Sequence, residues 1–177
     1  MALKSTSQPI VISTGFQQGA ANAFQVNPVD LQLNPLDQEV FVVTAVKIDF
    51  TNRPFSVAVP DNLVVCDFEV SVCKNRPSAM QDMASSNVIA TDKLFGLTAF
   101  DAASNPLSIS ISQNNAGDSP PSQLDYIDII ATDSFYIALD GFNTTFGSEG
   151  AVRMYGYRAR ADAATYAALV QSEMLSL

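Results

Sequence analysis

The chain has 177 residues, a formal net charge of −9, 47% hydrophobic residues, 15% charged residues and no histidine. This length predicts a single domain over residues 1–177, and the negative charge argues against nucleic acid or anionic lipid as the main ligand. Without histidine, the chain lacks the commonest general base and the commonest metal ligand.

The N-terminal part predicts short strands on either side of a polar segment. Residues 8–14 (QPIVIST) form the first expected strand, and the polar stretch 15–28 follows it. We therefore expect residues 1–28 to be a partly extended N-terminal segment. Residues 29–35 (VDLQLNP) alternate in hydrophobicity, which predicts a strand with one apolar face. That face carries Val29, Leu31 and Leu33.

Two long apolar strands are expected in the centre of the chain, over residues 39–50 and 63–74, joined by a proline-bounded connection. Cys66 and Cys73 both lie in the second strand, seven positions apart. In a straight strand this odd spacing puts them on opposite faces and roughly 23 Å apart, at about 3.3 Å per residue. A disulfide needs Cα atoms within about 7 Å. We therefore expect two buried free thiols, which favour a reducing compartment.

The second half of the chain alternates between β patterns and loop signals. Residues 75–86 predict a loop, with room for one helical turn, and residues 87–100 predict one or two strands. In PLSISIS (106–112), alternation predicts that Leu107, Ile109 and Ile111 face inward. Residues 113–122 form the strongest loop signal. Further strands are expected over 123–132, 134–142 and 151–159.

These patterns define the expected fold class. Eight or nine strands follow one another with no helix between them, which is typical of an all-β, antiparallel β-sandwich or barrel. Several connections are longer than those of simple hairpins. Long connections favour a jelly roll over an up-and-down barrel.

The last segment, residues 162–175, predicts a short C-terminal α-helix. Asp162 is its expected N-cap, and alanines with high helix propensity follow. Gln171 and Glu173 are expected to point away from the apolar face. Such a short helix is marginal in water on its own, so it must dock on its own sandwich, on a neighbouring copy or on a membrane surface. The expected apolar stripe consists of Ala163, Tyr166, Ala167, Val170 and Met174.

Four aspartates between residues 125 and 140 are the main candidates for acid chemistry. They occupy expected turns and strand ends, where Asp is common for structural reasons. We expect solvated loop carboxylates, with a calcium site and a catalytic pair as the weaker alternatives. No catalytic residue, cofactor or metal site is therefore predicted, and the chain is not expected to be an enzyme. The four residues are Asp125, Asp128, Asp133 and Asp140.

Three of the nine basic residues fall within eight positions near the C-terminus, with two tyrosines among them. Such arginines can pair with aspartates of the same chain or of another copy, or they can contact nucleic acid or lipid head groups. We favour acidic partners because the whole chain is negative. With the helix, this segment forms the expected assembly interface, which comprises Arg153, Tyr155, Tyr157, Arg158, Arg160, Tyr166, Val170 and Met174.

Two stretches, LDYIDIIATDSFYIALDG (124–141) and RMYGYRARADAATYAALVQSEMLS (153–176), carry a resemblance to known proteins. They resemble the C-terminal half of virion-type proteins from aquatic environments. In length and strand pattern, the whole chain is similar to the single jelly-roll capsid protein of small icosahedral, membrane-containing viruses of bacteria and archaea.

The resemblance implies a structural virion protein, made in the host cytoplasm, whose copies assemble into an icosahedral capsid shell. Expected partners are further copies of the chain, a second capsid protein and an internal membrane. The N-terminus offers only Lys4 as a basic residue, so specific nucleic-acid recognition is not expected. The alternatives are a subunit of an extracellular filament, against which the missing signal sequence argues, and a carbohydrate-binding β-sandwich module, against which the missing tryptophan argues.

Overall fold

A computed structural model describes residues 3–114, 117–118 and 125–175, which fold into eleven strands, one 3-10 turn and one helix. In chain order the elements are β1 (Lys4–Ser5), β2 (Ile10–Gln17), β3 (Gln25–Asp30), η1 (Pro35–Asp37), β4 (Glu39–Phe50), β5 (Leu63–Cys73), β6 (Val88–Phe100), β7 (Pro106–Asn114), β8 (Gly117–Asp118), β9 (Asp128–Ile130), β10 (Ser134–Phe142), β11 (Glu149–Arg160) and α1 (Ala163–Leu175).

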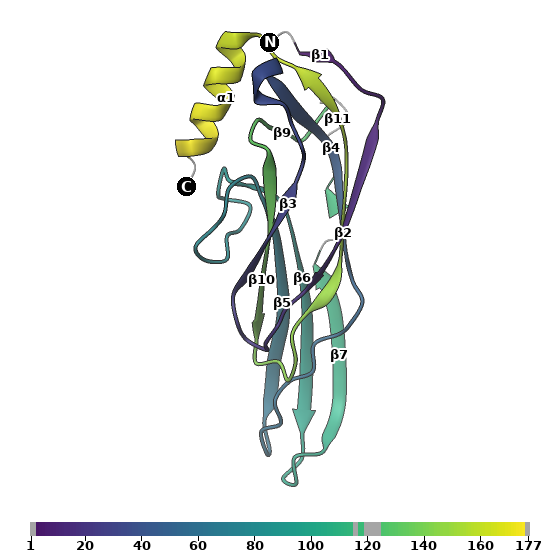
Figure 1. Ribbon diagram of the computed structural model, residues 1–177. Helices are drawn as coiled ribbons and strands as arrows, with labels where there is room; N and C mark the ends of the chain where they lie inside the picture. Colours follow the sequence, from purple (N-terminus) through teal and green to yellow (C-terminus); the bar gives the residue numbers. More distant parts are fainter. Residues whose placement is uncertain (1–2, 115–116, 119–124, 176–177) are drawn as a thin grey trace.

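The strands form two antiparallel sheets packed face to face (Figure 1). The first sheet has β11 and β4 at its centre; β1 and β2 pair with β11, while β8 and β9 pair with β4. The second sheet has the order β3-β10-β5-β6-β7. The predicted all-β sandwich with a short C-terminal helix is therefore confirmed.

The strand pairing is nested along the chain. β5 pairs with β6, β4 with β9, β3 with β10 and β2 with β11. Strands β2 to β5 thus pair, in reverse order, with the later strands β6, β9, β10 and β11. The resulting long antiparallel ribbon folds over into a sandwich. This is the jelly-roll winding, in which long connections cross between the sheets. β1, β7 and β8 are additions to the eight nested strands, so the expected count of eight or nine strands was too low for the described part of the chain.

Side-chain alternation builds the core between the two sheets. In β5 the side chains of Cys66, Phe68 and Val70 are fully buried on the inner face. Strand β4 carries apolar residues on both faces because one face meets the core and the upper part of the other face is covered by α1. This arrangement confirms the expectation that residues 39–50 are buried on both sides for part of their length.

One expected strand ends early: the strand predicted over 29–35 ends at Asp30, and Leu31 and Leu33 are buried from the turn that follows. In the N-terminal segment 1–28, expected to be partly extended, β2 puts Phe16 in the core and β3 already begins at Gln25. Residues 75–86 form a loop, as predicted, without the helical turn for which the sequence left room. Burial of isolated apolar residues outweighs the local polar composition around Phe16, Leu31 and Leu33.

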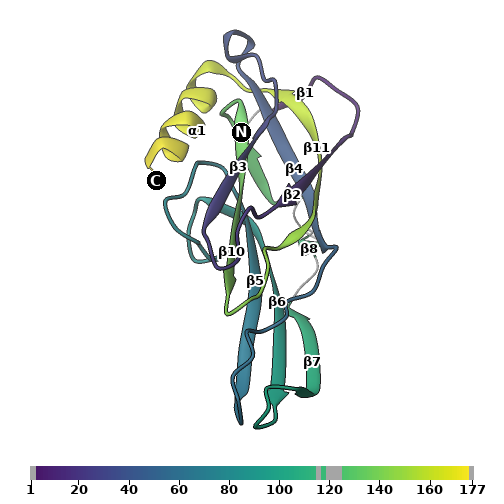
Figure 2. The same ribbon diagram turned by 60° about the horizontal axis from the view of Figure 1, so that its bottom comes forward.

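The two ends of the sandwich differ. Figures 1 and 2 show α1 at one end, beside β9 and the connection between β5 and β6. At the other end, β5, β6 and β7 continue past the strands of the opposite sheet. We call this second region the distal end. In the part of the chain that the structure describes, no helix has the length and apolar character needed to cross a membrane.

Candidate functional site

The residues of the expected assembly interface fall on the outer and inner faces of β11 and on α1. Arg153, Tyr155 and Tyr157 share the outer face of β11, and Arg158 faces the other way, as alternation predicts. Tyr157 packs against a small apolar cluster under α1. The structure therefore does not bring the eight residues together into one exposed surface.

Arg158 is occupied within its own subunit. Its Nη2 atom donates a hydrogen bond to the carbonyl oxygen of Leu31 at 3.0 Å, and its Nη1 atom lies 3.7 Å from Glu39 Oε2. The arginine thus holds the turn after β3 against the start of β4. A partner from the same chain matches the preference for acidic partners that the sequence suggested.

The helix α1 docks on its own sandwich. Tyr166, Leu169 and Val170 pack on a cluster formed by β4, β9 and β11. Asp162 is the predicted N-cap, since its Oδ1 atom accepts a hydrogen bond from Thr165 N–H at 2.8 Å. That hydrogen bond holds the pKa of Asp162 below its usual range. Of the predicted stripe, Ala163, Ala167 and Met174 are exposed, so the expected face was rotated relative to the observed one.

Glu173, expected to point to solvent, is only 3% exposed. Its Oε1 atom accepts a hydrogen bond from Ala131 N–H at 2.6 Å, and its Oε2 atom accepts one from Thr132 N–H at 3.1 Å. Burial raises the pKa of this carboxyl group, while the two N–H donors and the charge of Lys74 act in the opposite direction. The observed docking face follows i, i+3, i+4, i+7 spacing and consists of Tyr166, Leu169, Val170 and Glu173. Because Glu173 is acidic, a search for apolar residues alone does not find this face.

Three members of the expected interface remain at the surface: Arg153, Arg160 and Met174. Arg153 lies directly across from Lys47 on β4, and Arg160 lies across from Lys4 on β1. Like charges opposite one another are unfavourable within a sheet. Arg160 also lies across from Glu39 on its other side, which offsets this repulsion, so the pair Arg153 and Lys47 is the basic surface feature that the fold leaves unexplained.

The distal end carries the largest group of exposed apolar side chains. They come from β5, β6, β7, the end of β10 and the strap 54–60 that joins β4 to β5. Leu63 is 63% exposed and Leu107 is 69% exposed, values unusual for leucines within or beside strands. The group comprises Phe55, Val57, Val59, Leu63, Val65, Phe95, Leu97, Leu107, Ile109 and Phe142.

The expectation that Leu107 and Ile109 face a core was wrong. Ile109 shares the inner face of the sheet with Thr98, its partner on β6, yet 45% of it is exposed. Figure 1 shows that one end of β7 continues past the strands of the opposite sheet. Alternation predicts which side chains share a face, and it carries no information on how far the facing sheet extends.

The strap 54–60 partly covers the inner face of the distal end. Val57 N–H donates to the carbonyl oxygen of Asn143, and Thr145 N–H donates to that of Phe55. A Cβ atom on Gly96 would lie 2.7 Å from Cys66 Sγ and 3.1 Å from the carbonyl oxygen of Pro54. The strap therefore passes directly over Gly96 and needs that glycine. Its Phe55, Val57 and Val59 side chains face outward.

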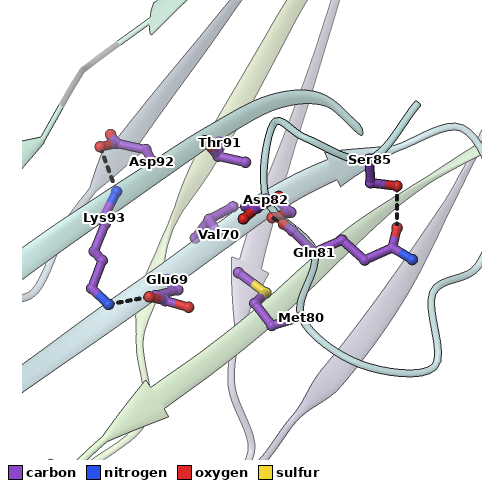
Figure 3. Close-up of a pocket in the computed structure, with 10 residues that line it drawn as sticks. Glu69, Val70, Met80, Gln81, Asp82, Ser85, Thr91, Asp92 and Lys93 are labelled. Atoms are coloured by element: carbon purple, nitrogen blue, oxygen red, sulfur yellow. Dashed lines mark hydrogen bonds and ion pairs between the residues drawn. The ribbon is translucent and has the colours of Figure 1, made fainter. Parts of the chain in front are cut away.

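A hollow of about 560 Å³ lies on the second sheet under the connection between β5 and β6 (Figure 3). The connection is fixed to the sheet because Ser71 Oγ donates to the carbonyl oxygen of Gln81. Asn87 supports it by donating to the carbonyl oxygen of Asn75 at 3.1 Å and to Gln81 Oε1 at 2.9 Å. The lining residues are Glu69, Val70, Ser71, Met80, Gln81, Asp82, Ser85, Thr91, Asp92 and Lys93.

Lys93 is the centre of an ion network beside this hollow. Lys93 Nζ pairs with Glu69, lies 3.1 Å from Asp67 Oδ2 and sits 4.7 Å from the centre of the Phe95 ring. Burial lowers the pKa of Lys93, but its hydrogen bonds and ion pairs with Glu69 and Asp67 raise that pKa overall. Asp92 makes a different contact: its Oδ2 atom accepts a hydrogen bond from Gln113, and burial raises the pKa of Asp92.

The four candidate aspartates do not converge. Asp128 begins β9 and lies 3.1 Å from Lys74 Nζ, while Asp140 lies within β10, not at its end as expected. Asp125 and Asp133 are exposed. Among residues 3–114, 117–118 and 125–175, no group of three or more metal-binding side chains comes together.

Cys66 and Cys73 are free and buried, as the sequence predicted. Burial raises the pKa of Cys73 to about 12. Cys66 has a raised pKa for the same reason, and its Sγ atom lies 3.6 Å from the carbonyl oxygen of Gly96. Both thiols are therefore protonated and poorly reactive at neutral pH.

No family model matches the chain, and no similar sequence was found among curated proteins.

Proposed function

We propose that this protein is a structural subunit that assembles with copies of itself into a closed shell, as the capsid protein of a virus. One observation carries the proposal: the distal end exposes ten apolar side chains, some on each face of the sheet and three on the strap 54–60. Exposed apolar side chains gathered in one region of a molecule mark protein–protein contacts. The jelly-roll winding supports the proposal, since viral capsid domains are among the proteins that use it.

The charge distribution also supports self-association. The chain carries a net charge of −9, so copies repel one another on average. Within residues 54–66 and 94–114 the charged side chains are Asp61 and Asp101 alone. Two copies therefore meet few charges at the distal end, where they also bury apolar surface.

In a virion, the proposed shell consists of repeated copies, with a second capsid protein and an internal membrane as further partners. An extracellular filament is the second candidate, because the edge of the second sheet at β7 has β6 as its sole strand partner in the described chain. Such an edge can accept a strand from another subunit.

Negative-stain electron microscopy of the purified chain distinguishes these functions. Closed shells or capsomer rings are expected for the capsid subunit, and fibres would favour the filament. A strictly monomeric protein at concentrations of about 0.1–1 mM, well above the Kd of an ordinary assembly contact, would contradict both.

A further inference from the structure

We infer that the edge strand β7 pairs with β7 of a second copy across a two-fold axis, so that the two five-stranded sheets join into one. This inference rests on the proposed self-assembly and names one of its contacts. The first observation is the outer edge of β7: among the described residues no strand pairs with it, over a strand of nine residues.

The two edges of this sheet are unlike each other. At the opposite edge, β3 contains Pro28, which lacks an N–H donor, and Asp30, which is charged. Both residue types are typical of edges that avoid further pairing. Beyond its first residue, Pro106, strand β7 has neither proline nor charge. The other uncharged edge, β2, lies beside Arg153 and Glu149 of β11.

The sequence of β7 is complementary to itself in antiparallel orientation. In the register that overlaps the full strand, Ser110 lies opposite Ser110 of the second copy. Ile109 then lies opposite Ile111, and Ser108 lies opposite Ser112. One face of the joint therefore holds four isoleucines and the other a row of serines, both favourable cross-strand combinations.

The inner face of β7 is apolar and exposed in the subunit. Leu107 is 69% exposed and Ile109 is 45% exposed, and Ile109 lies on the inner face with its β6 partner Thr98. Pairing of β7 with its copy brings these apolar side chains of the two subunits side by side and removes part of their surface from water.

Cysteine cross-linking tests the register directly in the full chain. Ser110→Cys places two thiols opposite each other at the axis, within the Cα separation that a disulfide needs. Ser108→Cys and Ser112→Cys are matched controls, because each residue lies about four positions, or roughly 13 Å, from its own symmetry mate. The native cysteines are buried, so the unmodified chain reports the background.

Under mild oxidation, Ser110→Cys is expected to form the disulfide dimer at least about tenfold faster than either control, since only its thiols meet the geometric limit. A mixture of Ser108→Cys and Ser112→Cys chains is expected to cross-link as well. Ile109→Lys, added to Ser110→Cys, is expected to suppress cross-linking while leaving the circular dichroism melt unchanged.

Two results would overturn the inference. If the chain assembles but Ser110→Cys cross-links no faster than the controls, the subunits meet through another surface and the proposed function stands. If the chain neither cross-links nor assembles, the inference and the proposed function fall together.

Discussion

The helix end and the distal end of this sandwich are built from similar apolar residues, yet the fold treats them in opposite ways. At the helix end, α1 covers Val40, Val42 and Ala159, and Glu173 accepts the backbone N–H groups that would otherwise lack partners. At the distal end, the sheet simply continues past its partner sheet and leaves apolar side chains in solvent. One end is completed within the subunit, and we propose that a second molecule covers the other.

Removal of α1 is the strongest test of whether the helix end is completed within the subunit. Deletion of residues 163–177 uncovers the apolar cluster and leaves the N–H groups of Ala131 and Thr132 without acceptors. We expect a loss of about 3–5 kcal/mol in the free energy of unfolding. Thermal denaturation is expected to show a melting temperature roughly 10–15 °C lower. A melting temperature within about 2 °C of the wild type, which corresponds to less than about 1 kcal/mol, would mean that α1 is not part of the folded subunit.

Substitution of Glu173 measures the contribution of its carboxylate to stability separately from that of the rest of the helix. Glu173→Ala removes both acceptors, so we expect a destabilisation of about 2–3 kcal/mol in urea unfolding. Glu173→Gln keeps one carbonyl acceptor and should cost about 1 kcal/mol. Equal costs for the two variants would show that side-chain volume, and not hydrogen bonding, matters at this position.

The protonation of Glu173 gives a pH dependence with a defined sign. Its pKa is raised in the folded state by burial, so the folded protein binds this proton more tightly than the unfolded chain does. The corresponding stability is fully present below the unfolded pKa of about 4.3 and is lost as the pH rises through the folded pKa.

The measurement is the unfolding free energy of the wild type minus that of Glu173→Gln, between about pH 4 and pH 7, the range above the unfolded pKa of a glutamate. This difference should fall as the pH rises. Asp67 and Asp92 also have raised pKa values, and the subtraction removes their contribution. A difference that increases with pH would contradict the assignment, because it would mean that the two N–H donors outweigh burial.

At the distal end, substitution of an exposed apolar residue should leave the stability of the subunit almost unchanged. Leu63→Glu alters a side chain that is 63% exposed, and its effect on unfolding is expected within about 0.5 kcal/mol. Its effect on association is expected to be at least tenfold, because it introduces a charge into an uncharged apolar contact. Sedimentation velocity is the measurement.

Leu36→Glu is the matched control, since Leu36 is 89% exposed in the 3-10 turn, outside the distal end. It should neither destabilise the subunit nor weaken association. If both variants weaken association equally, net charge and not the distal surface controls self-association.

The sequence predicted the parts of the fold that depend on local patterns. The strand at residues 39–50, the helix with its Asp162 cap and the sandwich class all follow from periodicity and capping. It did not predict that Glu173 is buried, because an acidic residue on a helix normally faces water, and its backbone partners in the turn after β9 are more than forty residues away.

The exposure of the distal end was also not predicted, because it too depends on residues that are far apart in the chain. Alternation in β7 correctly puts Ile109 and Ile111 on one face, but whether another sheet covers that face depends on the relative lengths of strands far apart in the chain. The scarcity of charged side chains within residues 54–66 and 94–114 was visible in the sequence. It is the signal that could have indicated an association surface.

Hydrogen exchange followed by mass spectrometry, at increasing protein concentration, tests the contrast between the two ends most directly. We predict that the amides of β7 gain protection as the chain associates, whereas those of α1 keep the same protection at every concentration. Oligomers that form without any added protection in residues 106–114 would contradict the account.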